Sequence, residues 1–223
     1  MLKNNFQFSV RGTRNTQLDR VGYHQGENWT FAYILDGLVE TTPHFVDCVD
    51  RNFKRAFKTI ERRQSLNSIR DLAINAIIKN VVNEGKASIA LLICVDGKVL
   101  TLTVGDTRVY FLNERTRTID HSRAQELISS GKLNESLLNQ NSFRKYLTKS
   151  VCKDMAEVEL DERIHNQVPE GSKFIICSDG FWSSFDDDEE IYNFNSKTLE
   201  AYLSALSIEN LSDNTSVMLL KKE

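Results

Sequence analysis

Apolar runs and helical stripes alternate along the first part of this chain. Phe31–Leu35 is a continuous run of bulky and branched apolar residues, which is typical of a buried strand. Phe6–Arg11 alternates between apolar and polar residues and predicts a half-exposed strand. Apolar residues recur at helical spacing from Pro43 to Ile60, after the capping residue Thr42, and again from Leu66 to Val82. We therefore expect strands followed by two amphipathic helices.

The middle of the chain predicts an antiparallel meander. Ser88–Val95 is almost wholly apolar, and Asp96-Gly97 after it is a strong hairpin signal. Val99–Val104 returns along the hairpin, and a second turn leads into Val109–Leu112. Asp96 is interpreted as a structural turn residue.

The remaining pattern mixes helices and strands around a polar, irregular segment at residues 132–153. The acidic run Asp186–Glu190 is expected to cap a helix start, where negative charge complements the helix dipole. The other predicted elements are a helix at Arg123–Ser130, a short helix near Phe143–Leu147, strands at Val158–Ile164 and Lys173–Ser178, a helix at Ser196–Leu206 and a final strand at Thr215–Leu220.

Composition adds that the chain is an ordinary globular protein. Its 223 residues are 40% apolar and 26% charged, which predicts one domain over residues 1–223. The net charge of −3 implies no general attraction to nucleic acids or membranes, and no apolar run reaches the roughly 20 residues that span a bilayer. Four scattered cysteines without zinc-ligand spacing, and an N-terminus without an apolar signal core, favour a reducing, cytoplasmic location.

Aspartates recur where predicted strands end. They are Asp36, Asp106 and Asp179, with Asp213 just before the last strand and Asp19 in an upstream loop. If these ends converge, they form an oxygen-rich pocket that favours magnesium or manganese over zinc. Arg14 near such ions would clamp a phosphate group with two hydrogen bonds. The chemistry that follows is metal-assisted attack of water on phosphorus.

The order of short motifs along the chain resembles the metal-dependent protein serine/threonine phosphatases, the protein phosphatase 2C family, in its compact bacterial type. The motifs are Gly12-x-Arg14-x-x-Gln17-Leu18-Asp19, Ile34-Leu35-Asp36-Gly37, Gly105-Asp106-Thr107-Arg108, Asp120-His121-Ser122, Cys177-Ser178-Asp179-Gly180-Phe181-Trp182 and Asp213-Asn214-x-Ser216-Val217. The resemblance covers nearly the whole chain. It implies an α+β fold, a four-layer β-sandwich of two antiparallel sheets flanked by α-helices.

The resemblance also implies residue roles and an activity. The activity is hydrolysis of phosphoserine and phosphothreonine in proteins by a metal-activated water, opposing a serine/threonine kinase. The cofactors would be two Mn²⁺ or Mg²⁺ ions, with a weaker third position. In these terms Asp36 bridges the two ions, Gly37 offers its carbonyl, Asp179 and Asp213 bind the second ion, Asp19 holds the cluster, Asp106 serves the third position and Arg14 takes the substrate phosphate.

Some positions depart from the family pattern. Leu18 replaces an acid or amide beside the metal, and Leu38-Val39-Glu40 replaces a histidine or methionine and two glycines. Ser183 stands where many relatives have an aspartate, which weakens the case for a third metal. His121 is interpreted as a helix-start or turn residue. The alternative function is therefore a catalytically weak or inactive phosphatase fold that acts as a regulatory binding module.

Overall fold

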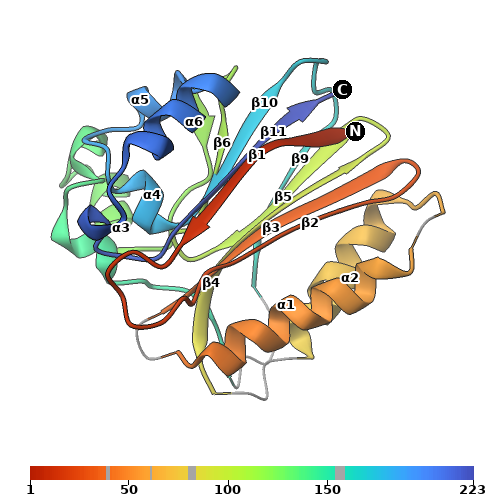
Figure 1. Cartoon of the computed structure of the whole chain (residues 1–223), viewed down its shortest axis with the longest axis horizontal. Helices are drawn as coiled ribbons and strands as arrows, with labels where there is room; N and C mark the ends of the chain where they lie inside the picture. Colours follow the sequence, from red (N-terminus) through yellow and green to blue (C-terminus); the bar gives the residue numbers. More distant parts are fainter. Residues whose placement is uncertain (39–40, 61, 80–83, 154–158) are drawn as a thin grey trace.

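Sheets form the centre of the molecule, and helices cover their outer faces (Figure 1). The computed structural model describes residues 1–223 except 39–40, 61, 80–83 and 154–158. Within this described part, two antiparallel sheets stack face to face between two helical layers. The predicted four-layer α+β sandwich is confirmed.

The first sheet carries both ends of the chain. Its strands, in spatial order, are β1 (Leu2–Val10), β11 (Thr215–Lys222), β10 (Lys173–Cys177), β6 (Arg108–Phe111) and β7 (Thr116–Arg117). The N-terminal strand β1 lies antiparallel to the C-terminal strand β11, from the pair Leu2 and Lys222 to the pair Val10 and Thr215. The termini therefore lie side by side, as Figure 1 shows.

The second sheet contains the predicted meander. Its strands, in spatial order, are β2 (Arg20–Gln25), β3 (Trp29–Gly37), β4 (Lys86–Val95), β5 (Lys98–Val104) and β9 (Asp161–His165), and β8 (Val151–Cys152) pairs with the start of β4. Asp96 turns the β4–β5 hairpin with a positive φ of 46°, so its predicted structural role is confirmed.

Helices cover the sandwich on both sides. They are α1 (Pro43–Lys58) and α2 (Leu66–Ile78) on the second sheet, and α4 (Asp179–Trp182), α5 (Glu189–Tyr192) and α6 (Ser196–Ala205) on the first. The remaining helical elements are α3 (Arg123–Ser129) and the 3₁₀ turns η1 (Glu135–Leu137), η2 (Ser142–Lys145) and η3 (Ile208–Asn210).

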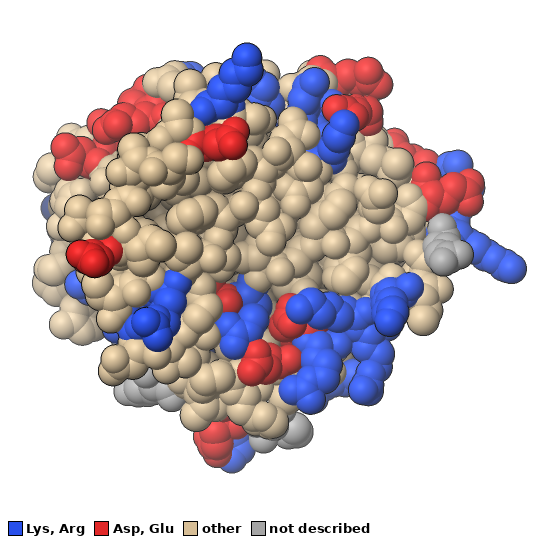
Figure 2. Space-filling model, viewed as in Figure 1, with Lys and Arg blue, Asp and Glu red and all other residues tan. Residues whose placement is uncertain are grey.

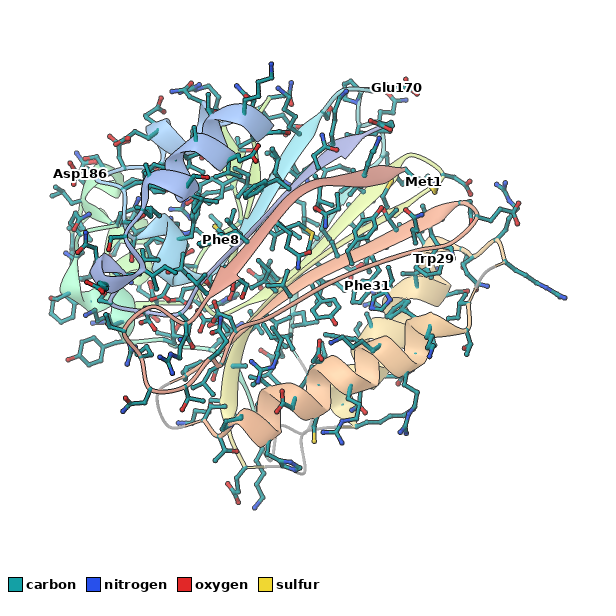
Figure 3. All side chains as sticks on the ribbon, viewed as in Figure 1. Met1, Phe8, Trp29, Phe31, Glu170 and Asp186 are labelled. Carbon is teal, nitrogen blue, oxygen red and sulfur yellow. The ribbon has the colours of Figure 1, made fainter. Side chains whose placement is uncertain are left out.

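Strand β3 shows why its sequence is apolar without alternation. Trp29 and Phe31 lie on the side of the sheet that faces α1 and α2, as Figure 3 shows, and they pack there with Phe53 and Phe57. Ala32 and Ile34, which alternate with these residues along the strand, face the other sheet. Because both faces are buried from Phe31 to Leu35, each of these positions favours an apolar residue.

Several predicted boundaries differ from the structure. Strand β1 begins at Leu2 rather than Phe6, because all of it pairs with β11. The short elements β2, β7 and α4 were not predicted from the pattern. The predicted helix residues Val81 and Val82 and the predicted strand start Val158 lie outside the described residues.

Gly37 also differs from its predicted role as a turn. It remains in strand β3, where it pairs with Ala87. A Cβ atom at this position would lie 2.9 Å from Leu18 Cβ and 3.1 Å from Val46 Cγ1, so glycine is needed for close packing.

Uncharged residues make up most of the visible surface, charged side chains of both signs are scattered over it, and basic ones gather over α1 (Figure 2). Arg55 and Lys58 lie in the last turn of that helix, where positive charge complements the helix dipole. None of the helices in the described ranges is both long and apolar enough to cross a bilayer.

Candidate active site

The strand connectivity brings the motif residues to one end of the sandwich. In the first sheet, the end of β1 lies beside the start of β11, which lies beside the end of β10. In the second sheet, the end of β3 lies beside the start of β4 and near the end of β5. Because neighbouring strands are antiparallel, these alternating starts and ends lie at the same edge.

A cleft of about 670 Å³ lies at this end. The predicted site residues that line it are Arg14, Asp36, Gly37, Asp106, Asp179 and Asp213. Leu38, Ser183 and Lys145 also line it, while Val39 and Glu40 lie outside the described residues. The predicted convergence of the motifs is therefore present in the folded chain.

Asp19 lies buried beside the cleft with 2% of its surface exposed. Ser178 Oγ, at the end of β10, donates a hydrogen bond of 2.8 Å to Asp19 Oδ2. Asp19 Oδ1 is buried and has no hydrogen-bond partner among the residues that the structure describes. Burial raises the pKa of Asp19 to about 7, despite hydrogen bonds from Ser216 and Ser178 that act the other way. A buried oxygen without a partner is costly, so this atom is suited to accept a cation or a donor.

Asp36, at the end of β3, lies in the most acidic surroundings. Burial raises its pKa well above the usual range, and the charges of Asp19, Asp179 and Asp106 raise it further. Each of these carboxylates disfavours ionisation of the others in the absence of a balancing positive charge.

Asp106 is held at the turn between β5 and β6. Ser88 Oγ donates to Asp106 Oδ1 at 2.8 Å, and Trp182 Nε1 donates to the Asp106 carbonyl at 2.8 Å. Burial and the nearby charge of Asp179 raise the pKa of Asp106 to about 8. Ser88 was not among the predicted site residues, although a polar residue early in the apolar β4 run is a usable signal.

His121 stabilises the same turn rather than lining the cleft. The Gly105 backbone N–H donates to His121 Nδ1 at 3.1 Å, and the His121 backbone N–H donates to the Gly105 carbonyl at 2.7 Å. His121 Nε2 lies 3.2 Å from Asp161 Oδ2. Its predicted place at a helix start is confirmed, directly before the N-cap of α3.

Arg14 and Asp213 form a two-pronged ion pair at the cleft. Arg14 Nε donates to Asp213 Oδ1 at 2.9 Å, and Arg14 Nη2 donates to Asp213 Oδ2 at 2.6 Å. The Arg14 side chain is 41% exposed, so part of its guanidinium faces solvent in the cleft. The hydrogen bond to Asp213 raises the pKa of Arg14, which therefore remains cationic.

Asn214 positions the loop that carries Arg14. Its Oδ1 accepts from the Leu18 backbone N–H at 2.7 Å, and its Nδ2 donates to the Arg11 and Thr16 carbonyls at 2.9 and 3.0 Å. Leu18 thus takes part through its backbone, whose carbonyl also accepts from the Gly37 N–H at 3.3 Å. Asn214 belongs to one of the motifs of the sequence, but the sequence did not predict that its side chain holds this loop.

Arg144, from η2, is a cleft residue that the sequence did not predict. Its Nη1 donates to Asp179 Oδ2 at 3.0 Å. Burial and the charge of Asp213 raise the pKa of Asp179, while Arg144 and a hydrogen bond with Asp36 act the other way. Arg144 belongs to a polar, irregular segment, where one arginine among several charged residues carries no distinguishing signal.

A separate buried ion network lies next to the cleft. Arg108 donates to both oxygens of Asp120 at 2.8 and 2.7 Å, and its Nη1 donates to Asp188 Oδ1 at 3.0 Å. Arg117 Nε donates to Asp188 Oδ2 at 2.6 Å. The acidic run stands at the start of α5 as predicted, with Glu189 and Glu190 in the first turn. The Asp188 side chain differs, since it binds the two arginines and makes no cap hydrogen bond within the described residues.

The donor atoms of the cleft fit a hard divalent cation. They are carboxylate oxygens, which suit magnesium or manganese, and they include the unpartnered Asp19 Oδ1. Across the described ranges, no three Asp, Glu, His or Cys side chains are arranged as a ready metal-binding group. The ion pairs of Arg14 with Asp213 and of Arg144 with Asp179 account for part of this, because they engage two of the carboxylates.

Comparisons with known proteins give matches in structure only. Neither the models of protein families nor the curated proteins contain a match to this chain. Serine/threonine phosphatase Stp1 from Staphylococcus aureus is 19% identical, with a TM-score of 0.81 over 100% of this chain and 96% of that chain. The S. agalactiae serine/threonine phosphatase is 17% identical, with a TM-score of 0.77 and full coverage of both chains, 100% and 100%.

A third similar structure was solved with metal. The catalytic domain of the serine/threonine protein phosphatase PstP, in complex with two manganese ions, is 15% identical, with a TM-score of 0.75 over 99% of this chain and 97% of that chain. At these identities the likeness concerns the fold. The protein therefore has the fold of the compact bacterial serine/threonine phosphatases, the protein phosphatase 2C fold.

Proposed function

We propose that this protein is a metal-dependent phosphatase that hydrolyses phosphoserine and phosphothreonine in proteins. The observation that carries the proposal is the cleft itself, where Arg14 and the carboxylates of Asp36, Asp106, Asp179 and Asp213 line one cavity. The same fold extends over nearly all of the similar phosphatase structures.

In this proposal, the aspartates hold two Mn²⁺ or Mg²⁺ ions. Asp36, Asp179 and Asp213 are the main ligands, together with the carbonyl of Gly37, and Asp19 supports them from its buried position. Asp106 serves a weaker third position. Bound cations would neutralise the phosphoryl group and activate a water for attack on phosphorus.

Arg14 orients the substrate. Its guanidinium donates to Asp213 through Nε and Nη2. Its remaining N–H groups can donate hydrogen bonds to the oxygens of a phosphate group. Asn214 holds the surrounding loop by its three hydrogen bonds, so the guanidinium stands in a defined place. A pre-positioned cation of this kind favours the charge that develops during phosphoryl transfer.

The substrate would be a phosphorylated protein that a serine/threonine kinase produces in the cytoplasm. Cys94 and Cys177 are buried free thiols, which fits a reducing compartment. The replacement of an acid or amide by Leu18 does not favour the alternative of an inactive binding module. The hydrogen bonds of Leu18 use its backbone N–H and carbonyl groups, which do not depend on the side chain.

Purified protein with manganese should release phosphate from p-nitrophenyl phosphate and from a phosphothreonine peptide. Asp36→Asn and Asp179→Asn should each lower kcat about 10³-fold or more, because each removes a charge that acts on the reacting group. Asp71→Asn is the matched control, since Asp71 is exposed on α2 and pairs only with a neighbouring arginine. Activity that survives both cleft substitutions unchanged would exclude the proposed site.

A further inference from the structure

Arg144 occupies an unusual place for a side chain of an irregular segment. It lines the cleft and is largely buried, with 14% of its side chain exposed. Its guanidinium donates to Asp179 Oδ2 at 3.0 Å, and its Cζ lies 5.1 Å from the centre of the Trp182 ring. The neighbouring Phe143 and Tyr146 are 48% and 66% exposed, so Arg144 is a largely buried side chain between exposed ones. The contact with Asp179 and Trp182 therefore joins this segment to the cleft.

The ion pair uses a carboxylate that the proposed function assigns to a metal. A divalent cation bound by Asp179 would lie within a few ångströms of the Arg144 guanidinium. At that separation two positive charges repel each other, and a partly buried site screens them less than water does. Arg144 and a divalent cation therefore compete for Asp179.

A displaced Arg144 still lies at the cleft, where bound divalent cations would offset the negative charge of the aspartates. Arg14, on the opposite loop, lines the same cleft. A guanidinium that leaves Asp179 keeps its full charge and its fork of N–H donors, which match the oxygens of a phosphate group. The cleft would then present two arginines to a phosphorylated side chain.

We propose that Arg144 is a displaceable counter-ion of Asp179. A divalent cation displaces it, and the released guanidinium then binds the phosphate group of the substrate. The inference rests on the proposed function, since it takes Asp179 as a metal ligand. It assigns to Arg144 a substrate-binding role that depends on metal loading.

The first test measures manganese binding by calorimetry, without substrate. Arg144→Gln should bind Mn²⁺ about threefold to tenfold more tightly than the wild type, because a competing cation has been removed. Arg144→Lys, which keeps the charge, should remain close to the wild type. Lys132→Gln is the control, since Lys132 is an exposed cation of the same segment and does not line the cleft. Equal or weaker manganese binding by Arg144→Gln would overturn the proposal.

The second test measures inorganic phosphate binding to the manganese-loaded protein. Arg144→Gln should bind phosphate about threefold to tenfold more weakly, and its KM for a phosphothreonine peptide should rise by a similar factor. A merely structural arginine would not produce opposite changes in metal and phosphate affinity. Unchanged phosphate affinity would refute the second step.

The two proposals fail in different ways. If Asp36→Asn bound manganese as tightly as the wild type, the proposed function would be contradicted. Manganese binding that depends on Asp36 but is the same in Arg144→Gln would contradict only the role of Arg144.

Discussion

Two neighbouring clusters in this protein use the same residue types with different charge balance. Around Arg108, two arginines face Asp120 and Asp188, and the hydrogen bonds between them engage both carboxylates. At the cleft, Arg14 and Arg144 are accompanied by Asp36, Asp106, Asp179 and Asp213, with Asp19 buried beside them. The first cluster is balanced by its own side chains, whereas the second has an excess of negative charge.

The pKa values of the aspartates follow this difference. Burial raises the pKa of Asp188, but Arg108 and Arg117 outweigh burial, and the pKa is lower than usual. Burial raises the pKa of Asp106 to about 8 with too little positive charge nearby to oppose it. A balanced buried network stabilises structure, while an unbalanced one is prepared for a cationic ligand.

The balanced cluster should give the largest effect on stability. Arg108→Met should lower the free energy of unfolding by about 3–5 kcal/mol, because buried Asp120 would lose both hydrogen bonds from Arg108 and keep the longer 3.7 Å ion pair with Arg117. Urea denaturation followed by circular dichroism measures this. Arg115→Met is the control, since Arg115 pairs with Glu189 at the surface and should cost less than about 1 kcal/mol. Equal losses for the two variants would contradict the distinction.

The unbalanced cluster should make stability depend on pH when a chelator removes divalent cations. The folded-state pKa values of Asp19 and Asp106, about 7 and about 8, lie above the unfolded value of 3.8. Between the unfolded pKa of 3.8 and the folded-state pKa values of about 7 and about 8, the folded protein binds more protons than the unfolded chain. The free energy of unfolding therefore falls as pH rises across this range. We expect a loss on the order of 2 kcal/mol between pH 5.5 and 8.

Thermal melts in chelator at the two pH values measure this loss. Manganese at pH 8 should restore the stability, since it binds the ionised carboxylates. Stability that rises with pH in chelator would contradict the assigned charge imbalance.

The smallest effect compares single aspartates of the two clusters. Asp106→Asn should stabilise the chelated protein at pH 8 by about 1 kcal/mol, because it removes one of the repelling charges while keeping an acceptor for Ser88. Asp120→Asn should instead destabilise it, since Asp120 balances Arg108. Urea denaturation of both variants in chelator at pH 8 measures these changes. A change in the free energy of unfolding with the same sign in both variants would contradict the difference in charge balance between the two clusters.

Much of this architecture could be predicted from the chain alone. The helical spacing from Pro43 onward predicted α1, and the Asp96-Gly97 hairpin placed β4 beside β5. Strand β2 was missed because its residues are mostly half-buried and give no clear alternation. It pairs with β3, and its Gly22 leaves room for the Tyr33 ring of that strand, a contact that a one-dimensional pattern does not contain.

The sequence by itself determined which residue types stand at the strand ends, since Asp36, Asp106, Asp179 and Asp213 each follow or precede an apolar run. Antiparallel pairing then brings those ends together. Only the tertiary structure decided how their charges are compensated. Asp188 meets two arginines, Asp179 meets Arg144 and Asp19 Oδ1 meets no partner, because residues far apart in the chain determine the electrostatic environment of a buried group.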